Sequence, residues 1–257
     1  MNRINKLFAK KQKNILSVYF TAGFPKLTDT LETIVELEKN GADLIEIGIP
    51  FSDPMADGTT IQQSSQKALE NGMSLKILFE QIKDVRQTVK IPLIMMGYLN
   101  PIYQYGIENF CKKCNEIGID GLILPDLPMD IYESEYKTIF LQHNLSNIFL
   151  ITPQTTENRI RLIDSLTNGF IYMVSSAATT GAKTAIANDQ EVYFKRIENM
   201  KLTNPKLIGF GISNKETFTR ACKYANGAII GSAFIKAVDE QGSLKEKVST
   251  FMKDLIH

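Results

Sequence analysis

The stretch DLIEIGIPFSDPMADG, residues 43–58, joins an apolar run to an acidic loop. Its first part, DLIEIGI (43–49), is almost continuously apolar and contains one carboxylate, Glu46, near its middle. Such a run is typical of a strand in a parallel sheet that is covered on both faces. Its last part contains Asp-Pro and Asp-Gly, which are common turn dipeptides. The stretch therefore predicts a buried strand that carries an acid and ends in a compact loop.

The same order of apolar run, turn and helical segment recurs along the whole chain. The runs are ILSVYFTAG (15–23), DLIEIGI (43–49), IPLIMMGY (91–98), DGLILPD (120–126), NIFLIT (147–152), GFIYMVS (169–175), PKLIGFG (205–211) and GAIIGS (227–232). Eight β/α units in 257 residues predict a closed (β/α)₈ TIM barrel and a single domain over residues 1–257. The alternative is an open doubly wound sheet, but the first turn, TAGFPKLTD, lacks its Gly-rich phosphate-binding fingerprint.

Two helices are predicted in addition to the barrel's own. Residues 1–14 predict a short amphipathic helix with Ile4, Leu7 and Phe8 on one face. Between the second and third strands, the segments TIQQSSQKALENG and SLKILFEQIKDVRQTV predict two consecutive helices where one would suffice.

The composition excludes several classes of protein. A net charge of +1 gives no long-range attraction to nucleic acid or to an anionic membrane. No apolar run approaches the ~20 residues needed to span a bilayer, and the N-terminus lacks the apolar core of a secretion signal. Cys111 and Cys114 form a C-x-x-C motif inside a helical pattern without a second pair, so we expect no metal site. This cysteine usage predicts a cytoplasmic protein.

Glu46 is the first candidate for catalysis. In a (β/α)₈ barrel the active site lies at the C-terminal ends of the strands, and Glu46 lies in the middle-to-late part of the second strand. If its face points into the barrel, we expect its side chain to reach toward the mouth. Burial would raise its pKa and suit it to act as a general acid and base near pH 7. The alternative is a structural ion pair with a lysine from a neighbouring strand.

The loop after this strand holds two further aspartates. Asp57 can face the mouth of the barrel, or it can cap the helix expected to begin near Thr59. Asp53, which precedes Pro54, is the better candidate for a purely local turn role.

Glycines at two late strand ends predict an anion site. Gly211 follows the seventh strand, and Gly231 and Ser232 follow the eighth, with Ser232 at the start of the last helix. Their backbone N–H groups could bind phosphate, as barrels often do after strands seven and eight. Tight turns and helix caps are the alternative. The small polar loop SSAATTGAK (175–183) indicates either a lid or a plain solvated loop. The chain has two histidines, and neither is placed to form a Ser-His-Asp triad.

Several motifs together resemble the tryptophan synthase alpha subunit family. They are LIEIGIPFSDPMADG after the second strand, FTAGFP (20–25), LPDLP (124–128), GFGIS (209–213) and GSAFIK (231–236), in the family's order along nearly the whole chain. The resemblance implies a barrel lyase of tryptophan biosynthesis that splits indole-3-glycerol phosphate into indole and glyceraldehyde 3-phosphate. It implies no cofactor in this chain, and a pyridoxal-phosphate beta subunit as partner in an α₂β₂ complex.

The resemblance also implies roles for individual residues. Glu46 is expected to be the general acid and base and Asp57 the second catalytic carboxylate. The remaining implied residues are Tyr172 and Thr180 at the substrate, Gly181, Gly211, Gly231 and Ser232 at the phosphate, and Pro50 and Asp53 at the beta subunit.

The chain departs from the family pattern at Ser176, Ala178 and Thr179 in the loop 175–183, and at Thr59. Two other functions stay open: a different phosphate-binding barrel isomerase or epimerase, and a weakly catalytic chain that mainly activates a beta subunit.

Overall fold

The computed structural model describes residues 2–175, 183–209 and 211–256, and its strands form one parallel sheet. The strands are β1 (Ile15–Thr21), β2 (Leu44–Gly48), β3 (Leu93–Met96), β4 (Gly121–Ile123), β5 (Ser146–Asn147), β6 (Leu150–Ile151), β7 (Ile171–Val174), β8 (Lys206–Gly209) and β9 (Gly227–Ile230). Their order in the sheet is β5-β4-β3-β2-β1-β9-β8-β7-β6. Every predicted strand is therefore present at its predicted place.

The sheet closes into a ring through residues 146–151. β5 pairs with β4 at one side, and β6 pairs with β7 at the other. The two residues that join them continue these contacts: Ile148 N–H donates to the Leu122 carbonyl (3.0 Å), and the Phe149 carbonyl accepts from Tyr172 N–H (2.9 Å). The predicted strand 147–152 is thus one segment that changes partner halfway, and the predicted (β/α)₈ barrel is confirmed.

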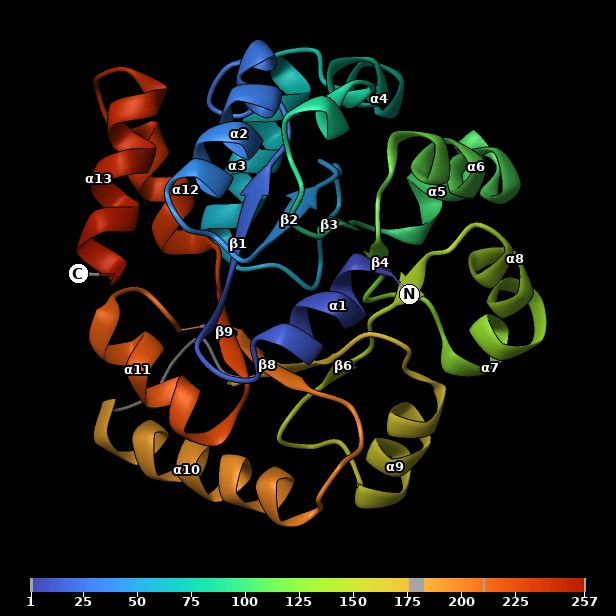
Figure 1. Ribbon diagram of the computed structural model, residues 1–257, viewed down its shortest axis with the longest axis vertical. Helices are drawn as coiled ribbons and strands as arrows, with labels where there is room; N and C mark the ends of the chain where they lie inside the picture. The colour runs from blue at the N-terminus through green and yellow to red at the C-terminus, as the bar shows by residue number, and fades with distance from the viewer. Residues whose placement is uncertain (1, 176–182, 210, 257) are drawn as a thin grey trace.

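The helices are α1 (Arg3–Lys10), α2 (Thr30–Lys39), α3 (Thr59–Glu70), α4 (Leu75–Ile82), α5 (Leu99–Tyr105), α6 (Ile107–Ile117), α7 (Met129–Ile131), α8 (Lys137–Gln142), α9 (Glu157–Leu166), α10 (Lys183–Asn199), α11 (Lys215–Tyr224), α12 (Ser232–Asp239) and α13 (Leu244–Ile256). All of them except α1 lie on the outer side of the ring (Figure 1). Both additional helices are present, namely α1 at the N-terminus and a second helix, α3 or α4, between β2 and β3.

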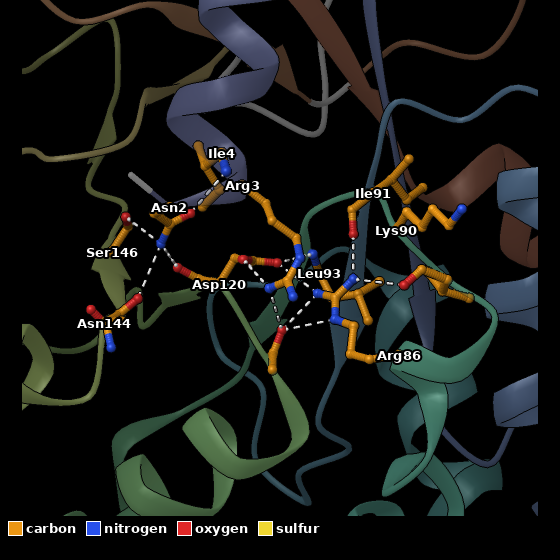
Figure 2. A network of polar contacts seen from close by, with 12 residues as sticks. Asn2, Arg3, Ile4, Arg86, Lys90, Ile91, Leu93, Asp120, Asn144 and Ser146 are labelled. Atoms are coloured by element: carbon orange, nitrogen blue, oxygen red, sulfur yellow. Dashed lines mark hydrogen bonds and ion pairs between the residues drawn. The ribbon is translucent and has the colours of Figure 1, made fainter.

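Helix α1 covers the end of the barrel where the strands begin, and it crosses the centre of the view in Figure 1. Ile4 is fully buried there, and the Phe8 ring lies 5.8 Å from that of Phe170. Asp120, buried at the start of β4, fastens the helix: its carboxylate accepts from Arg3 (3.0 Å) and Arg86 (2.6 Å), as Figure 2 shows. Helix α1 therefore covers this end of the barrel.

Buried side chains from α1 to α13 form one continuous hydrophobic cluster. The single domain over residues 1–257 stays a prediction. Among the residues that the structure describes, no helix has both the length and the apolar character required to cross a membrane.

Candidate active site

A cavity of about 310 Å³ opens at the end of the barrel where the strands finish. Its walls come from β1, β3, β7 and β9 and from the segments that follow β2, β8 and β9. The lining residues are Tyr19, Asp57, Gly58, Ile61, Met96, Tyr172, Gly211, Ile212, Ser213, Ile229, Gly231, Ser232, Ala233 and Lys236. Five sequence-predicted site residues therefore meet at one cavity: Asp57, Tyr172, Gly211, Gly231 and Ser232.

Glu46 lies in β2 and has no solvent exposure. The Ser17 hydroxyl donates a hydrogen bond to its Oε1 (2.8 Å), and its Oε2 has no hydrogen-bond partner among the described residues. Burial raises the pKa of Glu46 to about 8, and the Ser17 hydrogen bond opposes part of that rise. A carboxyl with this pKa is mostly protonated at pH 7 and can both give and take a proton.

Glu46 does not itself line the cavity. Its register partner in β1 is Tyr19, which does line it, and its hydrogen-bond partner Ser17 lies two residues before Tyr19. The expectation that the carboxyl reaches toward the mouth stays a prediction. The alternative of a lysine ion pair is not observed among the described residues.

Two tyrosines lie between Glu46 and the mouth. A Cβ atom on Gly48 would come within 2.2 Å of the Tyr19 hydroxyl, and one on Gly209 within 2.2 Å of the Tyr172 hydroxyl. Each ring thus lies against a glycine of the next strand. Burial is the main cause that raises the pKa of both tyrosines, and the charges of Glu46 and Asp57 add to it. Both hydroxyls therefore stay protonated.

Tyr19, Gly48 and Gly209 were not predicted from the sequence as site residues. The available signal was an aromatic residue in one strand and a glycine in the next, which becomes informative only when the strand register is known.

Asp57 reaches the cavity from the loop after β2. The Tyr98 hydroxyl donates to its Oδ2 (3.0 Å) and accepts from Ala56 N–H (2.9 Å), so the phenol fixes both the loop and the carboxylate. The Phe51 ring stacks on Tyr98 with centroids 5.1 Å apart. Burial raises the pKa of Asp57, and the Tyr98 hydrogen bond opposes that rise. The alternative role as a helix cap is not observed, since the N-cap of α3 is Gly58.

The glycine-rich wall lies opposite, at the ends of β8 and β9. Gly211 has a φ of +74°, a conformation that disfavours any side chain. Gly231 is the N-cap of α12, and it lines the cavity together with Ser232 and Ala233, the first two residues of that helix. The prediction that Ser232 begins the last helix is wrong, because α13 follows α12. Lys236, one turn further along α12, was not singled out from the sequence; with Asp57 it supplies the charge of the described lining.

The other predicted residues lie elsewhere. Thr180 and Gly181, with the rest of the lid segment 176–182, fall outside the described residues. Pro50 lines a separate groove against α4 and α5, together with Phe51. Asp53 is exposed and accepts a hydrogen bond from the Ser52 hydroxyl. Met55, in the same loop, is 89% exposed.

The described residues include no group of three or more His, Cys, Asp and Glu side chains placed to hold a metal ion. Cys111 and Cys114 lie in α6, where both are buried and unpaired, as is Cys222 in α11.

The whole chain is similar to known alpha chains of tryptophan synthase. Residues 5–255 match the sequence profile of the family described as "Tryptophan synthase alpha chain". The alpha chain from Flavobacterium johnsoniae is 64% identical over 245 residues, which are 95% of this chain and 96% of the relative. The alpha chain from Bacteroides thetaiotaomicron is 56% identical over 256 residues and is covered completely, as is this chain.

Solved structures agree with these sequence relatives. Tryptophan synthase subunit alpha from Legionella pneumophila superposes with a TM-score of 0.89 at 32% identity, covering 99% of this chain and 97% of the other. The tryptophan synthase A-subunit from Pyrococcus furiosus gives a TM-score of 0.86 at 35% identity, with 96% and 99% covered. By its sequence, its closed barrel and its cavity at the strand ends, the chain belongs to the tryptophan synthase alpha chain family.

Proposed function

We propose that Glu46 and Asp57 carry out the retro-aldol cleavage of indole-3-glycerol phosphate in this chain. The family's activity sets the reaction: the protein is an indole-3-glycerol phosphate lyase of tryptophan biosynthesis. The family uses no cofactor, and pyridoxal phosphate belongs to the beta subunit. The observation that carries the residue assignment is a fully buried carboxyl, with its pKa raised to about 8, beside a cavity that holds a second carboxyl.

The proton balance of the reaction suits one carboxyl that starts protonated. Glu46 gives its proton to the indole ring carbon that bears the glycerol chain. The carbon–carbon bond then breaks as the adjacent hydroxyl becomes the aldehyde carbonyl, and that hydroxyl's proton passes to the Glu46 carboxylate. The residue ends as it began, so no external acid or base is consumed.

Asp57 has a different task because its surroundings differ. Protonation of the ring carbon makes the ring nitrogen positively charged, and a carboxylate near that N–H stabilises it. The Tyr98 hydroxyl donates to Asp57 and so favours the charged carboxylate that this role requires. Because their environments differ, Glu46 can act as the proton carrier and Asp57 as a fixed negative charge.

The phosphate is placed at the opposite wall. Gly211, Gly231 and Ser232 line the cavity where α12 begins, and the partial positive charge of a helix start favours an anion. Lys236 lines the same wall and adds a full positive charge. Tyr172, on the cavity wall, is assigned to the indole-bearing part of the substrate. Thr180 and Gly181 are assigned to the substrate and the phosphate by the family resemblance alone.

The partner is proposed to be a pyridoxal-phosphate beta subunit in an α₂β₂ complex, which receives indole directly. Pro50 and Asp53 are its proposed contacts, since their loop also carries Asp57 and the exposed Met55. A reducing compartment, the cytoplasm, suits the three buried and unpaired cysteines.

The experiment that tests this function measures the products of the purified chain. Incubated alone with indole-3-glycerol phosphate, it should release indole and glyceraldehyde 3-phosphate in equal amounts. A barrel isomerase or epimerase would alter a sugar phosphate without releasing indole. A chain that only activates a beta subunit, the possibility raised by Ser176, Ala178 and Thr179, would release no indole by itself. Either result would reject the proposal.

A further inference from the structure

The sole hydrogen bond that the described residues make to the Glu46 carboxyl comes from Ser17. Both residues have no solvent exposure, and the Ser17 Oγ lies 2.8 Å from Glu46 Oε1. Glu46 Oε2 has no partner among the described residues. The two carboxyl oxygens are therefore unequal before any ligand binds.

The position of Ser17 in the barrel explains why this contact is specific. Tyr19 lines the cavity, and side chains two residues apart in a strand share a face, so Ser17 also points into the barrel. Its register partners are apolar, Leu44 in β2 and Ile229 in β9. An apolar residue at position 17 would leave both Glu46 oxygens without a partner, at a cost that buried polar groups rarely bear.

We propose that Ser17 is a positioning residue for Glu46: its hydroxyl holds Oε1 and leaves Oε2 as the oxygen that carries and exchanges the proton. The inference rests on the proposed function of Glu46. In a protonated carboxyl, the oxygen that accepts a hydrogen bond is the carbonyl oxygen, so a donor at Oε1 places the acidic proton on Oε2. Ser17 itself never contacts the substrate.

The proposal has a consequence for the dependence of rate on pH. A donor to a carboxylate favours the charged form, so removal of the Ser17 hydroxyl raises the pKa of Glu46. Because the reaction begins with protonated Glu46, kcat/KM falls as the pH rises through this pKa. Loss of the hydroxyl must therefore move the alkaline limb of the profile to higher pH.

The matched variants are Ser17→Thr and Ser17→Val, which have nearly the same shape and differ in the hydroxyl; Ser17→Ala guards against a packing defect. We expect S17T to follow the wild type. S17V and S17A should lower kcat about tenfold and move the alkaline limb up by roughly one pH unit, the size of one hydrogen bond to a charged group. The affinity for glycerol phosphate should be unchanged in all of them.

The proposal would be overturned if S17T and S17V had equal kcat values and if their kcat/KM fell at the same alkaline pH. Urea unfolding of wild type, S17A, Glu46→Leu and the double variant gives a second measurement that needs no turnover. Leucine removes the acceptor of the Ser17 hydrogen bond, so S17A should destabilise the Leu variant much less than it destabilises the wild type, and an equal effect in both would also overturn the proposal. Failure of the proposed function is distinct: Glu46→Gln would then keep full activity, whatever the Ser17 variants do.

Discussion

At the scale of single residues, the site separates two carboxyls by their surroundings. Glu46 has one hydroxyl donor and no exposure, whereas Asp57 lies at the cavity wall with a phenol donor. Both could be identified from the sequence, because an acid inside an apolar run and an acid in a turn after it stand out. Ser17 and Tyr98 could not, since their importance depends on which strand ends lie side by side.

Tyr98→Phe tests how Asp57 is held. Phenylalanine keeps the stack on Phe51 but removes the donor to Asp57, so the pKa of Asp57 should rise further. Since the role proposed for Asp57 needs its charged form, we expect indole release to fall about tenfold, and more steeply as the pH is lowered. Tyr105→Phe, at a tyrosine packed on Phe79, is the control. A Tyr98→Phe rate close to wild type at every pH would show that the phenol does not matter.

At the scale of elements, strand positions were predictable and loop contacts were not. The apolar runs located every strand, because a strand buried on both faces needs a nearly continuous apolar sequence. The change of partner within residues 146–151 was not predictable, since it follows from closing the ring. The Tyr19–Gly48 and Tyr172–Gly209 contacts likewise follow from register, which no single strand specifies.

The start of α12 can be tested with two substitutions at Gly231. A Cβ there would lie 3.4 Å from Tyr19 Cδ1, an ordinary contact, so Gly231→Ala should fold normally and bind glycerol phosphate almost normally. Gly231→Val adds two methyl groups at the wall proposed to hold the phosphate. We expect at least a tenfold weaker affinity by calorimetry, with a much smaller change in thermal stability. Unchanged affinity in a folded Val variant would place the phosphate elsewhere.

At the scale of the whole molecule, the barrel makes an acid's burial possible. The Asp120 network fastens helix α1 over one end of the barrel (Figure 2), and the cavity lies at the other end. Glu46, in the second strand, has no solvent exposure. The closed fold was predictable from the eight runs. The hydrogen bond between Ser17 and Glu46 was not, because it depends on the register of β1 against β2.

The buried acid should make stability depend on pH in a defined direction. The pKa of Glu46 is about 8 in the folded chain against an ordinary value of 4.5, so between these pH values the folded chain binds a proton that the unfolded chain has released. The contribution of this proton to the free energy of unfolding is complete below about pH 4.5 and is lost as the pH rises through about 8. Glu46→Gln stays neutral, so the variant should gain stability relative to wild type, on the order of a few kcal/mol, from about pH 5 to pH 9.

Urea unfolding of both proteins across that range measures the difference. The raised pKa of Asp57 is common to both chains and cancels in the comparison. A stability difference that does not change with pH would mean that Glu46 is not the proton-binding group.

Coupling to the beta subunit is a property of the assembled enzyme. The loop from Pro50 to Asp57 joins the proposed interface to the proposed active site, so a ligand in the cavity should tighten beta binding, typically by 1–3 kcal/mol. We expect glycerol phosphate to raise the alpha–beta affinity in a calorimetric titration. Asp53→Ala and Pro50→Gly should reduce the gain, while Asp254→Ala, an exposed position on α13, should not. Equal affinities with and without the ligand would contradict the coupling.

The rate of indole release by Glu46→Gln, measured on the chain alone at saturating indole-3-glycerol phosphate, tests the assignment of the proton carrier most directly. Glutamine keeps the shape but carries no exchangeable acid, so we expect kcat to fall by about 10²–10⁴ while glycerol phosphate still binds. Glu36→Gln is the matched control, because Glu36 is also buried but lies on α2, paired with Lys39. If Glu46→Gln released indole as fast as Glu36→Gln and wild type, Glu46 would not be the acid and base of this enzyme.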